Sequence, residues 1–140
     1  MCQPSDVGNV TVYQWNSKYE SVIKEKVAAL SNVAMQQLTL VWSQMENGKK
    51  AVKVYYFNTG TSFTVSPTDY NSYNPVFLNN LVVYFVDRVG GTDLDFFQFG
   101  ANTRGTLSWR KAIKSQITIS PANNKIAWVD DRLGSDDILV

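Results

Sequence analysis

The sequence predicts an α+β fold, an antiparallel β-sheet with helices packed on one face. Two patterns predict the elements: alternating side chains on either side of Asn47-Gly48, and apolar residues at helical spacing between Ser17 and Leu30. The length of 140 residues is typical of one compact unit. We therefore expect residues 1–140 to form a single domain.

The N-terminal segment predicts a strand followed by a helix. Residues Val10–Trp15 alternate β-branched and aromatic side chains, as strands do. Ser17 and Glu20 have the spacing of a helix-capping box. The apolar residues after this box recur at helical intervals, and they are Tyr19, Val22, Ile23, Val27 and Leu30.

The clearest local signal is a β-hairpin over Gln37–Asn58 with Asn47-Gly48 at its turn. Alternation along both arms indicates a more apolar face and a mixed face that bears hydroxyl, amine and phenol groups. We expect the mixed face to be open to solvent, because an antiparallel sheet can face water on one side. The apolar face would carry Leu38, Leu40, Trp42, Val52, Val54 and Tyr56.

The remaining segments show less regular sequence patterns. A loop over 59–75 would hold a short strand at Ser62–Val65, and Phe77–Val89 would form one long strand ended by Gly90-Gly91. Residues 93–99 fit a strand or the start of a helix. The C-terminal third predicts a helix at 106–114, strands at 116–120 and 125–129 joined by a turn at 121–124, and a solvated acidic end over 130–137. We find no internal repeat.

Composition argues against catalysis. The sequence has no histidine, which removes the commonest general base and metal ligand, and Cys2 is the single cysteine. The carboxylates Asp93 and Asp95 leave a hydrolase or magnesium site formally open, but we predict no enzyme, no metal and no cofactor. We also expect neither a secretory signal nor a membrane span. The net charge of +1 indicates no general attraction to polyanions.

Cations and rings are interleaved on segments that we expect to be neighbours. Lys49, Lys53 and Tyr55 precede Phe77 and Asn79, and such a mix serves single-stranded RNA, whose bases stack on rings while amines contact phosphate. An ordinary solvent-facing sheet explains the same residues. A second basic cluster is better explained as a solvated helix face around a packed tryptophan, and it comprises Arg104, Trp109, Arg110, Lys111 and Lys114.

The order of these features resembles the coat proteins of single-stranded RNA bacteriophages of the levivirus type. The resemblance covers about residues 5 to 89. It is carried by an early strand, a hairpin with a polar turn and the opening of a later strand, in the strings Gly8-Asn9-Val10-Thr11-Val12, Gln37-Leu38-Thr39-Leu40-Val41-Trp42-Ser43, Lys49-Lys50-Ala51-Val52-Lys53-Val54 and Phe77-Leu78-Asn79-Asn80-Leu81.

The resemblance implies an intertwined homodimer, an icosahedral shell and an inner sheet face that binds a hairpin of the phage's own RNA, thereby repressing translation. Phe77 would stack on a base, Asn79 would be a polar contact and Lys49 would reach phosphate. The RNA-binding residues implied are Thr39, Val41, Ser43, Lys49, Lys53, Tyr55, Phe77 and Asn79. The sequence thus predicts a capsid protein of the virion. The alternative is a small non-capsid β-rich module that binds single-stranded nucleic acid or a small ligand.

Overall fold

A computed structural model describes residues 7–28, 31–108, 112–131 and 137–139 of the chain, and these residues form thirteen β-strands. Within them there is no α-helix, only a 3₁₀ turn at Pro121–Asn123, so the predicted α+β class with packed helices is wrong. The strands are β1 Val7–Gln14, β2 Tyr19–Ala28, β3 Ser31–Gln36, β4 Thr39–Glu46, β5 Lys49–Tyr56, β6 Thr61–Thr64, β7 Ser72–Leu78, β8 Leu81–Arg88, β9 Gly91–Gln98, β10 Thr103–Ser108, β11 Lys114–Ser120, β12 Lys125–Asp130 and β13 Asp137–Leu139.

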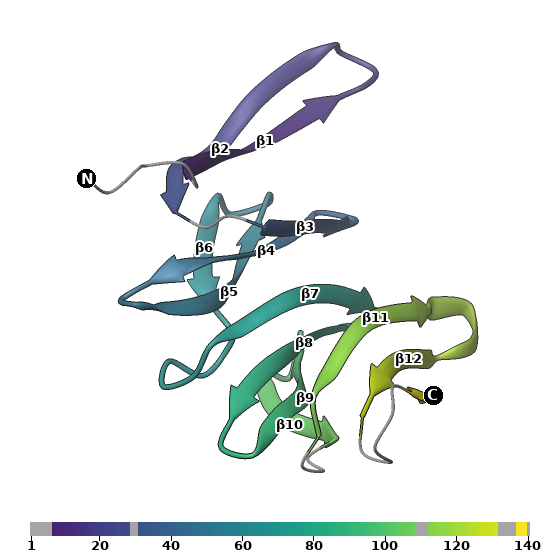
Figure 1. The fold of residues 1–140 in the computed structure, drawn as a ribbon. Helices are drawn as coiled ribbons and strands as arrows, with labels where there is room; N and C mark the ends of the chain where they lie inside the picture. Colours follow the sequence, from purple (N-terminus) through teal and green to yellow (C-terminus); the bar gives the residue numbers. More distant parts are fainter. Residues whose placement is uncertain (1–6, 29–30, 109–111, 132–136, 140) are drawn as a thin grey trace.

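The strands form four antiparallel sheets, each built from consecutive strands (Figure 1). We call β1–β2 the N-terminal hairpin, β3–β6 the first blade, β7–β10 the second blade and β11–β13 the third blade. The first strands of the three blades, β3, β7 and β11, contact one another in that order. The blades therefore follow one another in space as they do in sequence, with their first strands together on one side.

The first two blades are copies of one structural unit, offset by 42 residues. Left-handed backbone conformations recur at this spacing in three turns, at Gln37 and Asn79, Gly48 and Gly90, and Gly60 and Asn102. The backbone hydrogen bond from Phe57 N to Leu38 O likewise recurs from Phe99 N to Asn80 O. Four-stranded units of 40–45 residues are typical of β-propeller blades. The expectation that the chain has no internal repeat is wrong.

Apolar side chains fill the junctions between sheets, so both faces of the first two blades are covered. One cluster joins the first and second blades, through residues such as Val41, Val52 and Tyr84. Another joins the second and third blades around Phe85 and Leu94. Each fully buried valine or leucine contributes about 1.5–3 kcal/mol. The predicted open face of the first blade does not exist, because another sheet lies where solvent was expected.

The hairpin at Asn47-Gly48 is confirmed, with Glu46 pairing to Lys49 across a two-residue turn. The predicted division of its faces is wrong. Residues paired directly across an antiparallel ladder share a face, so Leu40 faces the same way as its partner Tyr55, and Val41 the same way as Val54. The hairpin also lies in a different sheet from Phe77, although the RNA-binding hypothesis needed them side by side in one sheet.

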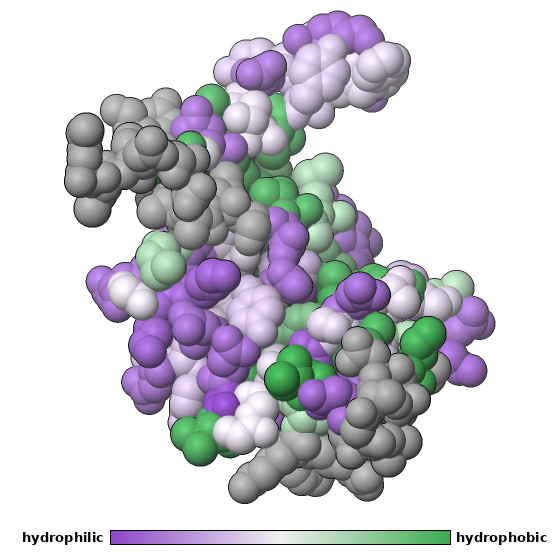
Figure 2. All heavy atoms as spheres, viewed as in Figure 1, coloured by the Kyte–Doolittle hydropathy of each residue, from purple (hydrophilic) through white to green (hydrophobic). Residues whose placement is uncertain are grey.

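The helix predicted at 17–30 is wrong in its described part, where β2 pairs with β1. Ser17 lies in a turn with left-handed Lys18, so its spacing to Glu20 is not a cap. Among the side chains of this period that the structure describes, Tyr19 and Val22 are exposed and Ile23 packs on the core, so they do not form a buried stripe. Figure 2 shows hydrophobic side chains at the base of this hairpin, where it meets the first blade, and a paler, more hydrophilic tip. Positions 29 and 30 lie outside the described residues.

Two further predictions fail because turns and buried strands were misread. The run 77–89 is two strands, broken at Asn79-Asn80, where Asn79 has φ of 53°. The helix predicted at 106–114 is replaced by β10 and the start of β11, and 109–111 lie outside the described residues. Residues 93–98 belong to β9, which is buried on both faces and therefore lacks clear alternation, and Phe99 begins the following turn.

The other strand predictions are confirmed by β1, β6, β11 and β12, and the turn predicted at 121–124 is the 3₁₀ turn. The acidic end is not wholly solvated, because Asp130 is fully buried and Asp131 accepts a hydrogen bond from Ile113 N at 2.7 Å. Residues 132–136 lie outside the described part. Trp42 is a core residue, as expected from its place on the apolar face of the hairpin, and Trp15 is exposed.

Candidate functional site on the first strands of the blades

The first strand of every blade is interrupted at the same place by a residue in the left-handed conformation. These residues are Asn32 in β3, Asn74 in β7 and Gln116 in β11, with φ of 53°, 54° and 50°. They lie 42 residues apart, and each coincides with a shift in strand pairing. This backbone conformation is costly for residues other than glycine, and asparagine tolerates it best. A strained residue repeated at equivalent positions is a pointer to function.

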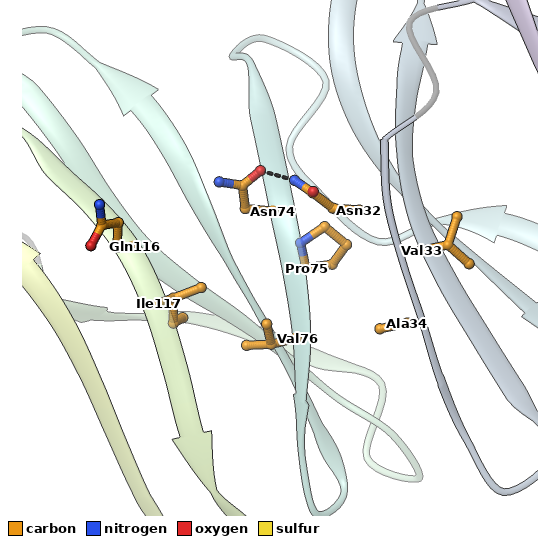
Figure 3. Close-up of a pocket in the computed structure, with 8 residues that line it drawn as sticks. All are labelled: Asn32, Val33, Ala34, Asn74, Pro75, Val76, Gln116 and Ile117. Carbon is orange, nitrogen blue, oxygen red and sulfur yellow. Dashed lines mark hydrogen bonds between the residues drawn. The ribbon is translucent and has the colours of Figure 1, made fainter.

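The three carboxamides lie in a row on neighbouring strands (Figure 3). Asn32 Nδ2 donates a hydrogen bond to Asn74 Oδ1, which ties the first blade to the second. Beside this row is a second one of aliphatic side chains. Together they line a pocket of about 360 Å³, formed by Asn32, Val33, Ala34, Asn74, Pro75, Val76, Gln116 and Ile117. We call this surface the inner wall.

The inner wall is electrically neutral. Its polar groups are carboxamides, each with two N–H donors and an oxygen acceptor, and no charged side chain lines the pocket. It also lacks a hydroxyl, thiol or carboxylate that would serve as nucleophile or base. The arrangement is suited to holding an uncharged partner by hydrogen bonds over an apolar floor.

A second set of amide contacts joins the blades at the turns after their first strands. Gln36 Nε2 donates to Asn79 O at 3.0 Å. Asn79 Nδ2 in turn donates to Asn124 Oδ1 and to Pro121 O. Amide side chains therefore link all three blades at these turns, and at the inner wall they link the first blade to the second.

The buried charges form ion pairs within the folded chain. Arg88 bonds Asp93 and Asp95, and these bonds, that to Asp95 foremost, raise the pKa of the guanidinium above its usual value. Lys114 Nζ lies 4.0 Å from Asp130 Oδ2 and donates to Thr92 O at 2.5 Å, with both charged side chains fully buried. No group of three or more potential metal ligands occurs in the described ranges. These charges hold strands together.

The residues predicted to bind RNA are scattered through the fold. Val41 and Ser43 are buried at a blade junction, and Lys53 pairs with Glu46 at 2.9 Å. Lys49 is exposed beside the Asn47-Gly48 turn, and Tyr55 is half-buried with its ring against Phe57.

Three predicted residues do lie together. Thr39, Phe77 and Asn79 line a groove between the first and second blades. Of the predicted second basic cluster, Arg104 is exposed and Lys114 is buried, and the others lie outside the described residues.

The residues of the inner wall were missed. The signal that would have found them is the 42-residue spacing of Asn32, Asn74 and Gln116, which has meaning only once a repeat is recognised. A short sequence echo also exists, because Asp87-Arg88-Val89-Gly90 recurs 44 residues later as Asp131-Arg132-Leu133-Gly134.

Comparison with solved structures identifies the architecture. The chain superposes on the crystal structure of TolB from Acinetobacter baumannii with a TM-score of 0.71 at 15% sequence identity, over 94% of this chain. The fold is TolB-like. At this identity the likeness establishes the fold alone, and the chain spans only 35% of the length of the TolB chain. No protein family and no curated protein matches the sequence.

The TolB-like fold overturns the resemblance to levivirus coat proteins. Most residues of the quoted strings lie in strands, although 37–38 and 79–80 are turns. These strands belong to the N-terminal hairpin, the first blade and the second blade, and not to one sheet backed by helices. The virion, homodimer and RNA-binding predictions lose the resemblance on which they rested. In the described part of the chain, no helix is long and apolar enough to cross a membrane.

Proposed function

We propose that this chain is a binding module without catalytic activity, and that the inner wall holds an extended segment of a partner polypeptide. The observation that carries the proposal is the row of carboxamides on Asn32, Asn74 and Gln116, held at equivalent strained positions of three neighbouring strands. The left-handed backbone conformation costs free energy in each blade. Contact with a ligand is a reason for a protein to keep such a conformation.

A polypeptide is the best match to this wall. A peptide group offers one donor and one acceptor, and a carboxamide offers both complements. The aliphatic row formed by Ala34, Val76 and Ile117 would contact alternate side chains of an extended segment. The wall is neutral, so it lacks the cations that single-stranded nucleic acids require for their phosphates. The proposal therefore favours a neutral peptide stretch over an oligonucleotide.

The test is selection from a displayed library of random 12-residue peptides, followed by affinity measurements with the synthetic peptides that are enriched. In the variant Asn74→Gly the carboxamide is lost but the left-handed backbone is accommodated without strain. We expect peptide affinity to fall about 5- to 10-fold, the effect of one or two lost hydrogen bonds.

The matched control is Asn102→Gly, which makes the same change at a left-handed asparagine in the turn between β9 and β10. This control should bind peptide like the original chain. Equal loss in both variants, or enrichment no greater than on an unrelated β-rich protein, contradicts the proposal. Circular dichroism and urea unfolding establish that both variants are folded.

A further inference from the structure

Two grooves lie at successive blade junctions, share two positions of the repeat and differ in chemistry. The first, of about 390 Å³, lies between the first and second blades, and its lining is Gln36, Gln37, Thr39, Tyr56, Phe77, Asn79, Asn80 and Phe99. The second, of about 510 Å³, lies between the second and third blades, and its lining is Leu78, Leu81, Leu94, Leu107, Asn124, Lys125, Ile126 and Trp128. The 42-residue offset places Gln36 where the second groove has Leu78, and Thr39 where it has Leu81.

The second groove shows what packing alone requires at such a junction. Leucines fill the positions of Gln36 and Thr39 there, so a blade junction can form with apolar side chains at both positions, whereas in the first groove Gln36 Nε2 donates to Asn79 O. The side chains of Gln37 and Asn80 are exposed and that of Thr39 is half-buried, and within the described part of the chain none of the three is bonded to another residue, so their polar groups are available to a ligand. The first groove thus departs from the repeat in a way that favours a ligand.

The floor of the first groove is aromatic. Phe77 and Phe99 are stacked with centroids 6.1 Å apart and planes at 29°, and Tyr56 meets Phe99 edge to face at 6.1 Å. The repeat has Gln98 and Ile119 at the positions of Tyr56 and Phe77, and the second groove is lined by one aromatic residue, Trp128, instead of three. Partial burial raises the pKa of Tyr56, which keeps the phenol neutral. Phe77 is only 7% exposed, so the accessible ring surface of the floor comes from the half-buried Tyr56 and Phe99, together with the hydroxyl of Tyr56.

The combination of an aromatic floor, a rim of carboxamides and no charged side chain selects for one ligand class. A sugar ring has an apolar C–H face that packs on aromatic rings, and its edge carries hydroxyls that both donate and accept. A phosphorylated or carboxylated ligand would find no counter-charge in this groove. We infer that the groove between the first and second blades is a binding site for an uncharged saccharide. It is separate from the inner wall and does not depend on peptide binding there.

Binding is tested with maltotriose, cellotriose and tri-N-acetylchitotriose as probes, and with uridine and adenosine as ring-bearing comparison ligands. Chemical-shift changes of the isotope-labelled chain report both affinity and place. We expect at least one of the three saccharides to bind with a Kd of about 1 mM or tighter, as suits one ring in a shallow site. The shifts should centre on Thr39, Asn80 and Phe99.

The discriminating variant is Gln36→Leu/Thr39→Leu, which gives the first groove the two leucines that the second has at these positions. Saccharide affinity should fall at least about 10-fold, because the rim is lost while the packing mode is one that the chain already uses. A second variant, Asn80→Ala, alters an exposed side chain and keeps the test valid if the double variant does not fold. The control Asn74→Gly, on the inner wall, should bind saccharide unchanged.

The inference is overturned by several results. These are no shift with any saccharide at about 10 mM, binding of nucleosides but not of saccharides, or undiminished affinity in both groove variants. If the chain binds saccharide in the groove but no peptide on the inner wall, only the proposed function is contradicted.

Discussion

The first and second blades carry the same polar cluster with opposite charges. In the first blade, Lys53 Nζ lies 2.9 Å from Glu46 Oε2 and 2.8 Å from Thr64 Oγ1. Forty-two residues later in each case, the second blade has Asp95, Arg88 and Thr106. There Arg88 Nη2 lies 2.8 Å from Asp95 Oδ2, and Thr106 Oγ1 donates to Asp95 Oδ1 at 2.9 Å.

This reversal shows that the blade requires a pair of opposite charges at these two positions, and that either position can carry the positive one. Each cluster links the second, third and fourth strands of its blade, and either charge order satisfies the buried groups. The clusters differ in depth. The side chain of Asp95 is 6% exposed and that of Arg88 26%, against 16% for Lys53 and 33% for Glu46. The second blade also adds Asp93, whose Oδ2 is 2.8 Å from Arg88 Nη1.

The largest effect should come from the deeper cluster. Asp95→Ala removes the central carboxylate and leaves Arg88 with Asp93 alone. Breaking a buried pair costs about 3–5 kcal/mol, and partial solvation of Arg88 reduces our expectation to about 2–3 kcal/mol. Lys53→Ala, the equivalent change in the first blade, should cost about 1 kcal/mol, because its partner is more exposed. Urea unfolding with unchanged m-values measures both.

Equal losses of stability in these two variants would show that depth does not set the strength of the clusters. Thr61→Ala, at an exposed edge-strand position, serves as a control and should change the free energy of unfolding by no more than about 0.5 kcal/mol.

A charge swap within the first blade tests whether order matters. Lys53→Asp alone places two carboxylates together and should destabilise the chain by about 2 kcal/mol. The double variant Glu46→Arg/Lys53→Asp gives the first blade the arrangement of the second, and it should recover at least half of that loss. The coupling energy of the double-mutant cycle is the quantity to measure. A double variant no more stable than Lys53→Asp alone would mean that the surroundings of the first cluster favour one charge order.

Sequence reasoning succeeded where the signal was local. The Asn47-Gly48 hairpin was predictable because a two-residue turn of this kind fixes the register of its arms. The strands β11 and β12 were predictable for a similar reason, with Pro121 marking the turn between them. The choice of strand over helix at Asp93–Phe99 was not, because a strand buried on both faces loses the alternation that identifies strands.

The repeat and the candidate sites could not be predicted from local sequence signals. The first two blades have the same backbone arrangement, but residues at equivalent positions are often chemically different. Lys53 and Asp95, for example, occupy equivalent positions with opposite charges. Asn32 and Gln116 read as ordinary turn or surface residues until their strands are placed together. The levivirus resemblance failed for a related reason, since consecutive strands of several small sheets can imitate the order of strands in a single large one.

The smallest change in stability is predicted at Tyr73 of the second blade. The equivalent residue of the first blade is Ser31. Its hydroxyl donates to Asp87 Oδ1 at 2.7 Å, and Lys50 of the first blade lies over its ring at 5.6 Å. Burial foremost, with the bond to Asp87, raises the pKa of Tyr73 to about 12. The folded state therefore favours the neutral phenol. Its contribution to stability is complete below the ordinary pKa of 10 and is lost as the pH rises towards 12.

Tyr73→Phe keeps the ring but removes the titrating group. At pH 8 we expect it to lower stability by about 1 kcal/mol or less, the value of one hydrogen bond. The difference from the original chain should shrink as the pH is raised from 10 to 12, because ionisation removes the same bond in the original chain. Tyr19→Phe at the exposed hairpin tip is the matched control. A difference that stays constant across this range would mean that the Asp87 contact does not hold Tyr73 neutral, and that ring packing alone fixes it against the first blade.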